Sequence, residues 1–253
     1  MESLMKAVCE SETGVDLLES FNVAETRAGE GVKSLGTCLV SGKLSNLKLL
    51  YLNRSGVSDE GMLSVALAVE GGHLGGLRVL DLSQNDFGRN GAEAFFASLS
   101  PSSCSFLPPH SETPVSIKGG GRLPFLESLL VYETRAGESI SLFARVLQKD
   151  HCPNIRSLDF DNAGVGDSGI VSLSEIFHHT SLPSLLHLGL RRNNIGIEGL
   201  TTFLEALLPS SLPRLHWLFL EGNPLAVHVS ESRFLFQKAR KEGKLPRLES
   251  PML

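Results

Sequence analysis

The sequence predicts an α/β solenoid, in which about seven repeats of 29–30 residues stack a parallel concave sheet inside a layer of outer helices. Three observations predict this horseshoe. The pattern L-x-x-L-x-L-x-x-N-x-L occurs at 77–87 and again at 185–195, and related copies recur at a nearly constant spacing. Apolar residues at helical spacing follow the copies, so each repeat is expected to combine one short strand with one amphipathic helix.

The repeats begin at seven positions. Five copies are clear, and the two weaker ones, which begin at 18 and 126, are each followed by the hexapeptide Glu-Thr-Arg-Ala-Gly-Glu, at 25–30 and 133–138. Six identical residues in one register predict an internal duplication, for which a block of three repeats is one candidate unit. The starts are separated by 29, 30, 49, 29, 30 and 30 residues: Leu18, Leu47, Leu77, Leu126, Ile155, Leu185 and Leu215.

Stacking follows from the composition of each repeat. The alternating leucines of a strand point to one side, and one strand with one helix cannot bury that side alone. An asparagine at the ninth position is expected to satisfy backbone groups where the strand turns away. Asn85, Asn193 and Asn223 occupy this position in three repeats, and we expect local irregularity elsewhere, greatest at Ala163. The replacements are Thr26, Ser55, Thr134 and Ala163.

The chain divides into three expected segments. Residues 1–17 form a short N-terminal segment or cap, residues 18–225 form the repeat domain, and residues 226–253 form a C-terminal capping helix and tail. A terminal cap is expected because the last repeat would otherwise expose its apolar face. We expect a helix over 230–241 with Ser230 as its N-cap, and we expect Phe234 and Leu235 to cover the open end of the last repeat.

The spacing of 49 residues contains an insertion at about 101–122, rich in Pro, Ser and Gly. This composition predicts an excursion without a packed element. We favour an insertion that is tolerated at the surface, because lengthening a loop costs little closure entropy. A loop that grips a partner or is phosphorylated on its serines is the alternative.

The repeat length and the full helix in each repeat resemble the ribonuclease-inhibitor-like leucine-rich-repeat proteins, over roughly residues 18–225. This family includes the sensor regions of NOD-like receptors, tropomodulin and the GTPase-activating protein for Ran. The resemblance implies a leucine-rich-repeat solenoid and is nearly silent on function.

Composition excludes several classes of function. A net charge of −5 argues against a general affinity for nucleic acid or for a membrane surface. No window has the eighteen apolar residues that span a bilayer, and the start resembles no leader peptide, so we expect a cytoplasmic protein, with a nuclear one as the alternative. The four cysteines are far apart and are expected to be reduced, and His178-His179 has no partner at metal-ligand spacing. We therefore expect no metal and no cofactor.

The repeat frame identifies the side chains of the concave face. Both tyrosines and the single tryptophan fall on it, and large amphipathic aromatic residues often anchor interfaces. The alternative is that these rings pack against neighbours across the sheet, and that the charges of adjacent strands neutralise one another. The predicted partner-binding residues are Tyr51, Asn53, Tyr132, Asp159, Asp161, Arg191, Trp217 and Phe219.

No catalytic motif is present in the sequence, so we expect a protein that is not an enzyme. The leading hypothesis is a non-catalytic protein–protein interaction or scaffold protein that binds a partner through the concave face, as a free chain or as a subunit of a larger assembly. The alternative is a GTPase-activating protein that resembles the Ran GTPase activator, with Asn53 and Arg54 as candidate residues. A third hypothesis is an inhibitor that occludes an enzyme, although the face is neither strongly acidic nor densely aromatic.

Overall fold

The computed structural model describes residues 17–26, 31–100, 104–106, 114–177, 180–249 and 251. Most of the expected N-terminal segment and the His178-His179 pair lie outside the described residues. No helix in the described part of the chain is long and apolar enough to cross a membrane.

Seven short strands form one parallel sheet, and their order in the sheet follows their order in the sequence. The predicted α/β repeat fold is therefore confirmed. Each strand has three residues, and its middle residue aligns with the middle residues of its neighbours. The strands are β1 (Ser20–Asn22), β2 (Leu49–Tyr51), β3 (Val79–Asp81), β6 (Ser128–Leu130), β7 (Ser157–Asp159), β8 (His187–Gly189) and β9 (Trp217–Phe219).

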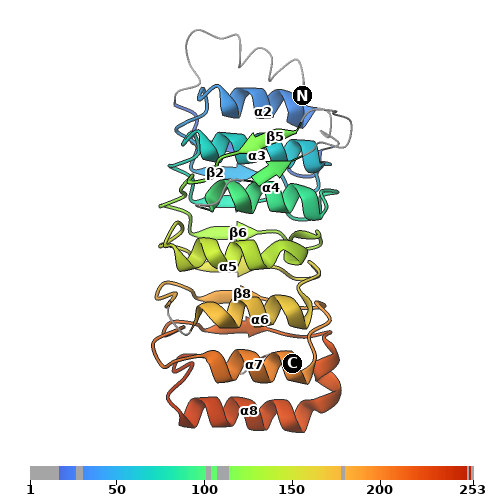
Figure 1. Ribbon diagram of the computed structural model, residues 1–253, viewed down its shortest axis with the longest axis vertical. Helices are drawn as coiled ribbons and strands as arrows, with labels where there is room; N and C mark the ends of the chain where they lie inside the picture. The colour runs from blue at the N-terminus through green and yellow to red at the C-terminus, as the bar shows by residue number, and fades with distance from the viewer. Residues whose placement is uncertain are drawn as a thin grey trace.

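The helices form a second layer that covers one side of the sheet, from α2 at one end of the stack to α8 at the other (Figure 1). A 3-10 turn precedes the helix in two of the repeats. The elements are α2 (Gly31–Val40), α3 (Asp59–Glu70), α4 (Arg89–Leu99), η1 (Ala136–Ser139), α5 (Ile140–Gln148), α6 (Gly166–Ile176), α7 (Ile197–Ala206), η2 (Pro224–His228) and α8 (Val229–Lys241).

The hydrophobic core lies between these two layers and runs without interruption past the insertion. The ring centroids of Phe96 and Phe143 are 5.0 Å apart, and those of Phe143 and Phe160 are 5.8 Å apart. These three buried rings belong to the third, fourth and fifth repeats. Because they pack as one series, the first three repeats and the last four share a single core.

Asparagine side chains join consecutive repeats, as the sequence predicted. The Oδ1 atom of Asn193 accepts hydrogen bonds from the amides of Ala163 and Val165 in the preceding repeat, at 3.0 and 3.1 Å. Its Nδ2 atom donates to the carbonyl oxygens of Phe160 and Arg191. One buried amide thus satisfies backbone groups of two repeats. Asn85 and Asn223 make equivalent bonds.

The expected irregularity appears one repeat before Ala163 rather than at it. Because each asparagine bonds back to the preceding repeat, Ala163 leaves the fourth repeat without this contact. There the amide of Ala136 donates instead to the hydroxyl of Thr134, at 3.2 Å, and the 3-10 turn η1 follows. The strand that precedes Ala163 keeps its regular register.

A second contact supports the proposed duplication. The Oδ1 atom of Asp59, in the second repeat, accepts hydrogen bonds from the amides of Gly88 and Gly91 at the start of the helix in the third repeat. Asp167, in the fifth repeat, accepts one from Gly196 in the sixth. The same relation thus recurs three repeats later, as duplication of a three-repeat block would produce.

The insertion contains a packed element, so the prediction of an excursion without one was wrong. Its strands β4 (Cys104–Phe106) and β5 (Val115–Ile117) pair antiparallel. The side chain of Ile117 is fully buried in a small cluster with Leu63 and Ala66 of α3 and Ala94 of α4. The hairpin therefore covers the outer side of two helices.

Helix α3, beneath the hairpin, carries an apolar residue where three other helices carry charge. Leu67 lies five residues after the first buried apolar residue of α3, and its side chain packs against the hairpin cluster. The equivalent residues of α5, α6 and α7 are Arg145, Glu175 and Glu205, and all three are exposed. The apolar residue that allows the Pro- and Gly-rich insertion to pack thus lies in α3, outside the insertion itself.

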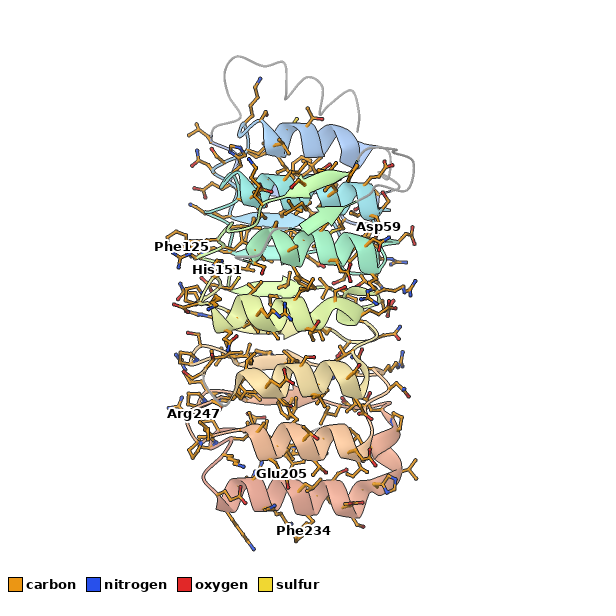
Figure 2. All side chains as sticks on the ribbon, viewed as in Figure 1. Asp59, Phe125, His151, Glu205, Phe234 and Arg247 are labelled. Atoms are coloured by element: carbon orange, nitrogen blue, oxygen red, sulfur yellow. The ribbon has the colours of Figure 1, made fainter. Side chains whose placement is uncertain are left out.

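The C-terminal helix covers the last repeat with different residues from those we expected. It begins at Val229 after His228, not after Ser230. Phe236 is buried at 4% exposure, and Leu235 packs against the core, whereas Phe234 is 64% exposed and points away from the stack (Figure 2). Phe236 rather than Phe234 therefore closes the core.

The cysteines also differ in part from expectation. Cys38 is disulfide-bonded, so the prediction of four reduced thiols was wrong for this residue. Cys152 is a free, buried thiol. Burial raises the pKa of Cys152 to about 12, so this thiol stays protonated and unreactive at neutral pH.

Candidate partner-binding face

One side of the sheet is free of helices, and we call it the open sheet face. It consists of the first and third residues of each strand and of the second residue after each strand, which point away from the buried middle residues. All eight predicted partner-binding residues lie on this face and are partly exposed: Tyr51, Asn53, Tyr132, Asp159, Asp161, Arg191, Trp217 and Phe219. That they bind a partner stays a prediction.

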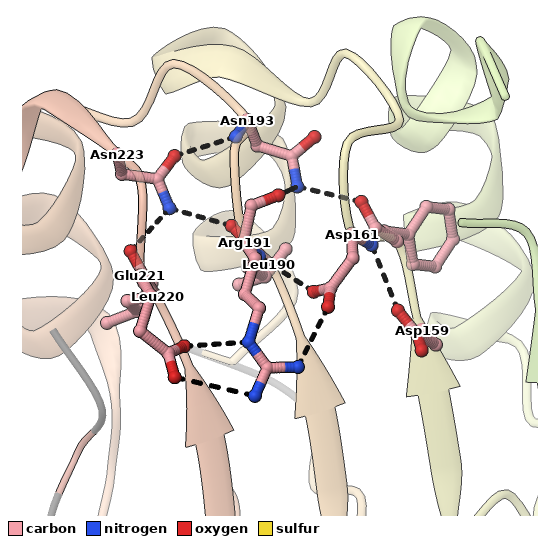
Figure 3. A network of polar contacts seen from close by, with 9 residues as sticks. Asp159, Asp161, Leu190, Arg191, Asn193, Leu220, Glu221 and Asn223 are labelled. Atoms are coloured by element: carbon pink, nitrogen blue, oxygen red, sulfur yellow. Dashed lines mark hydrogen bonds and ion pairs between the residues drawn. The ribbon is translucent and has the colours of Figure 1, made fainter. Parts of the chain in front are cut away.

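Arg191 is held by two carboxylates (Figure 3) and by one aromatic ring. Its Nη1 atom lies 3.0 Å from Oδ2 of Asp161, and its Nε atom lies 2.8 Å from Oε2 of Glu221. The guanidinium carbon lies 4.0 Å from the centre of the Phe219 ring. Burial acts to lower the pKa of Arg191, but hydrogen bonds to Glu221 and Asp161 outweigh it and raise the pKa. The charges of these strands therefore do neutralise one another in part, as the alternative interpretation expected.

Asp159 lies beside this network but outside its ion pairs. Its Oδ1 atom accepts a hydrogen bond from the amide of Asp161 at 3.0 Å. Among the described residues, no cationic side chain forms an ion pair with Asp159. Burial raises the pKa of Asp159, and the charge of Asp161 adds to the rise. The positive charge of Arg191 acts in the opposite direction but does not cancel the rise, so the carboxylate is partly desolvated without a direct ion pair.

Gly189 makes room for these carboxylates. A Cβ atom at this position would lie 2.6 Å from Oδ1 of Asp159 and 2.9 Å from Oδ1 of Asp161. Both acids therefore lean over the glycine from the neighbouring strand. A larger residue in this strand position would displace them.

A hollow of about 450 Å³ opens in front of these groups. Its lining contains four carboxylates and two guanidinium groups, which leaves an excess of two negative charges. Tyr132 forms one wall, and burial, followed by the charges of Asp81 and Asp159, raises the pKa of its phenol. The charged lining groups are Glu133, Asp159, Asp161, Glu221, Arg191 and Arg192.

The aromatic residues do not gather at one place. The ring of Trp217 stacks on His187 with centroids 4.2 Å apart, and the centroid of the His216 ring lies 5.3 Å from that of Trp217. Burial, followed by the charge of His216, lowers the pKa of His187. Trp217 thus packs across the sheet, as the alternative interpretation expected. Tyr51 lies on β2, near the opposite end of the sheet from β9.

Three residues of this region were missing from the predicted site: Gly189, Glu221 and His187. The sequence carried a signal for each of them, because each stands at an open-face position of the repeat frame. A glycine where most repeats carry a side chain predicts a hollow. In the described part of the chain, no three His, Cys, Asp or Glu side chains are grouped so that they could hold a metal ion.

Comparison with known families agrees with the repeat frame. A family model described as "Leucine Rich repeat" matches residues 77–96, from the start of the third repeat, and residues 151–174, from just before the start of the fifth repeat. This chain is a leucine-rich-repeat protein. Repeats of 29–30 residues with a full helix make it ribonuclease-inhibitor-like in type.

Two solved structures to which this chain is similar are distant in sequence and in structure. The tropomodulin C-terminal domain of Caenorhabditis elegans is 16% identical with a TM-score of 0.41, over 81% of this chain and 90% of that one. A chain of the TLR13–ssRNA13 complex is 17% identical with a TM-score of 0.25, over 72% of this chain and 36% of that one. No curated protein sequence matches this chain. None of these likenesses carries an argument about what the leucine-rich-repeat protein binds.

Proposed function

We propose that this leucine-rich-repeat protein is a non-catalytic interaction or scaffold protein that binds a protein partner through the open sheet face. The observation that carries the proposal is a row of partly exposed aromatic and charged side chains along one uncovered sheet, with a hollow near its middle. Aromatic and arginine side chains in such settings contribute much of the binding energy of protein interfaces.

Rigidity of this face supports the same proposal. Arg191 and Phe219 are held against each other and against two carboxylates, and Trp217 is stacked on His187. Side chains that are already ordered lose little conformational entropy on binding, which favours affinity. The eight predicted residues are therefore proposed as the contact surface, with the Arg191 network as its fixed centre.

Site-specific photo-crosslinking tests the proposal directly. A photoreactive phenylalanine analogue would replace Tyr51, Tyr132 or Trp217 in cells that express the protein, and Arg145 or Glu175 on the outer helices would serve as matched control positions. We expect discrete crosslinked adducts from the open sheet face and none from the helices. Adducts from the helix positions alone would refute the assignment of the face.

A triple Tyr51→Ala, Tyr132→Ala, Trp217→Ala variant gives an independent readout. We expect it to keep the circular dichroism spectrum of the wild type and to lose affinity for the crosslinked partner by at least about a hundredfold, which corresponds to two or three anchor residues. An unchanged affinity in the folded variant would contradict the proposal.

A GTPase-activating function remains the second candidate because Arg54 is exposed beside Asn53. Among the described residues, its guanidinium is held only by a 3.8 Å ion pair with Glu25. An arginine that reaches a bound nucleotide accelerates GTP hydrolysis strongly. Hydrolysis assays with a panel of small GTPases distinguish the two functions. Acceleration that is lost in the Arg54→Ala variant would favour the activator, and its absence would favour the interaction protein.

A further inference from the structure

The middle of the open sheet face carries acidic groups without cations. Asp81 on β3 and Asp159 on β7 are aligned in register, with Leu130 of β6 between them. Asp81 is 7% exposed, and its Oδ1 atom accepts the amide hydrogen of Ser83. Within the described residues, neither carboxylate takes part in an ion pair. This part of the face is therefore complementary to positive charge.

Arg191 supplies that charge only in part. Its Nη1 atom is directed at Asp161, and its Nε and Nη2 atoms are directed at Glu221, at 2.8 and 3.4 Å. The face of its guanidinium lies over Phe219. Because its donors point toward these neighbours, the guanidinium makes no direct ion pair with Asp159, and its charge offsets the desolvation of that carboxylate only in part.

The hydroxyl of Ser83 lies beside Tyr132, which lines the hollow. Ser83 is fully buried, and its Oγ atom has no hydrogen-bond partner of acceptable geometry among the described residues. It lies close enough to the phenol of Tyr132 to lower the pKa of that phenol slightly, against the larger rise from burial. A buried hydroxyl that lacks a partner is uncommon in folded proteins.

The shape of the hollow fits a flat cation. Asp159 occupies the space that Gly189 leaves over the sheet and lines the hollow, and Tyr132 forms the adjacent wall. A carboxylate and an aromatic ring are the two groups that recognise a guanidinium, the first by paired hydrogen bonds and the second by its π face. The excess of two negative charges in the lining remains after Arg191 and Arg192 are counted.

We infer that this hollow receives an arginine side chain of the protein partner, with Asp159 as the acceptor of the guanidinium and Tyr132 as the wall on which it stacks. This inference rests on the proposed function and adds the chemistry of the partner to it. The partner segment is therefore basic at the point where it crosses β7 and β8.

The probe for this inference is a library of random heptapeptides displayed on phage and selected on the wild-type protein. We expect enrichment of peptides that contain arginine. A selected peptide would then be synthesised with its arginine and with citrulline, which has a similar shape but no charge. Wild type and Asp159→Asn would be titrated with both, and Glu175→Gln on the outer face of α6 would serve as the matched charge control.

We expect the wild type to bind the citrulline peptide at least about tenfold more weakly than the arginine peptide. Asp159→Asn should bind the arginine peptide more weakly than the wild type does, by the same factor. The two changes together should cost no more than either alone, because they remove the same contact. Glu175→Gln should bind like the wild type.

Two outcomes would overturn the inference. The first is a set of peptides that contain no arginine, bind the Tyr51, Tyr132, Trp217 triple-alanine variant more weakly than the wild type, and bind Asp159→Asn as tightly as the wild type. Such peptides would refute the inference and leave the proposed function standing. A selection that yields no peptide bound to the open sheet face would count against both.

Discussion

A Cβ atom at Gly189 would lie 2.6 Å from the Oδ1 atom of Asp159 on the neighbouring strand. The first prediction is that Gly189→Ala displaces the Asp159 carboxylate, which lines the hollow. The displaced atom is at the end of a flexible side chain, so we expect a loss of about 1 kcal/mol in the free energy of unfolding, at the low end for overpacking.

Urea denaturation measures that loss of stability, and titration with a selected arginine peptide measures the affinity of the hollow for arginine. Affinity should fall at least about tenfold. Gly75→Ala is the matched control, because its new Cβ would make only ordinary contact, with the nearest atom at 3.4 Å. Full peptide affinity in Gly189→Ala would contradict the prediction.

The second prediction concerns the pH dependence of stability. Burial raises the pKa of Asp159, so the folded state holds this proton more tightly than the unfolded state does. The contribution of this group to folding stability therefore falls as pH rises from the ordinary aspartate pKa toward the raised pKa. At neutral pH the ionised carboxylate destabilises the folded state. Asp159→Asn removes this cost and keeps an oxygen that accepts the amide hydrogen of Asp161.

We expect Asp159→Asn to be more stable than the wild type at pH 7 by less than about 1 kcal/mol, because the side chain is partly exposed to solvent. The difference should shrink as pH falls toward about 4, where the wild-type carboxyl is increasingly protonated. Urea denaturation across this range checks the prediction. A variant that is less stable at pH 7 would show that the charge is compensated within the protein.

The sheet could be predicted from the sequence because its determinants are local and repeated. The leucine frame assigns every strand residue to one side of the sheet, and the structure keeps that frame through all seven strands. The hairpin could not be predicted in the same way. Its own composition disfavours packing, and the residue that compensates, Leu67, lies in a helix more than thirty residues earlier.

The open sheet face shows a similar division. Residue positions in the repeat predicted which side chains share the face, including Tyr132, Asp159 and Arg191. They could not predict the carboxylates with which Arg191 forms ion pairs. That choice depends on side-chain rotamers and on the space left by Gly189, which are set by packing across three strands rather than by spacing along the chain.

The third prediction is that the hairpin is part of the stable fold. Ile117 is fully buried against Leu63, so Ile117→Ala should lower the free energy of unfolding by about 2–4 kcal/mol. In a double-mutant cycle, Ile117→Ala and Leu63→Ala should couple by at least about 0.5 kcal/mol, since the two side chains pack in one cluster. The exposed neighbour Lys118, changed to alanine, is the control and should change stability by less than about 0.5 kcal/mol. Additive costs for the pair would mean that the hairpin does not pack on α3 in solution.

The fourth prediction compares two phenylalanines of the C-terminal helix. Phe236 is 4% exposed and Phe234 is 64% exposed, although they lie two residues apart on α8. Phe236→Ala should lower the free energy of unfolding by about 3–5 kcal/mol, whereas Phe234→Ala should change it by less than about 0.5 kcal/mol. Each variant serves as the control for the other.

Hydrogen exchange locates the effect along the array. Because each repeat of a solenoid is stabilised by its neighbours, loss of Phe236 should speed amide exchange most in β9 and α7, less in β8, and hardly at all in β2. The reverse ranking of the two variants would mean that Phe234 covers the last repeat in solution. Uniform exchange across all strands in Phe236→Ala would mean that the array unfolds as one unit, and that its end is not protected by α8 separately.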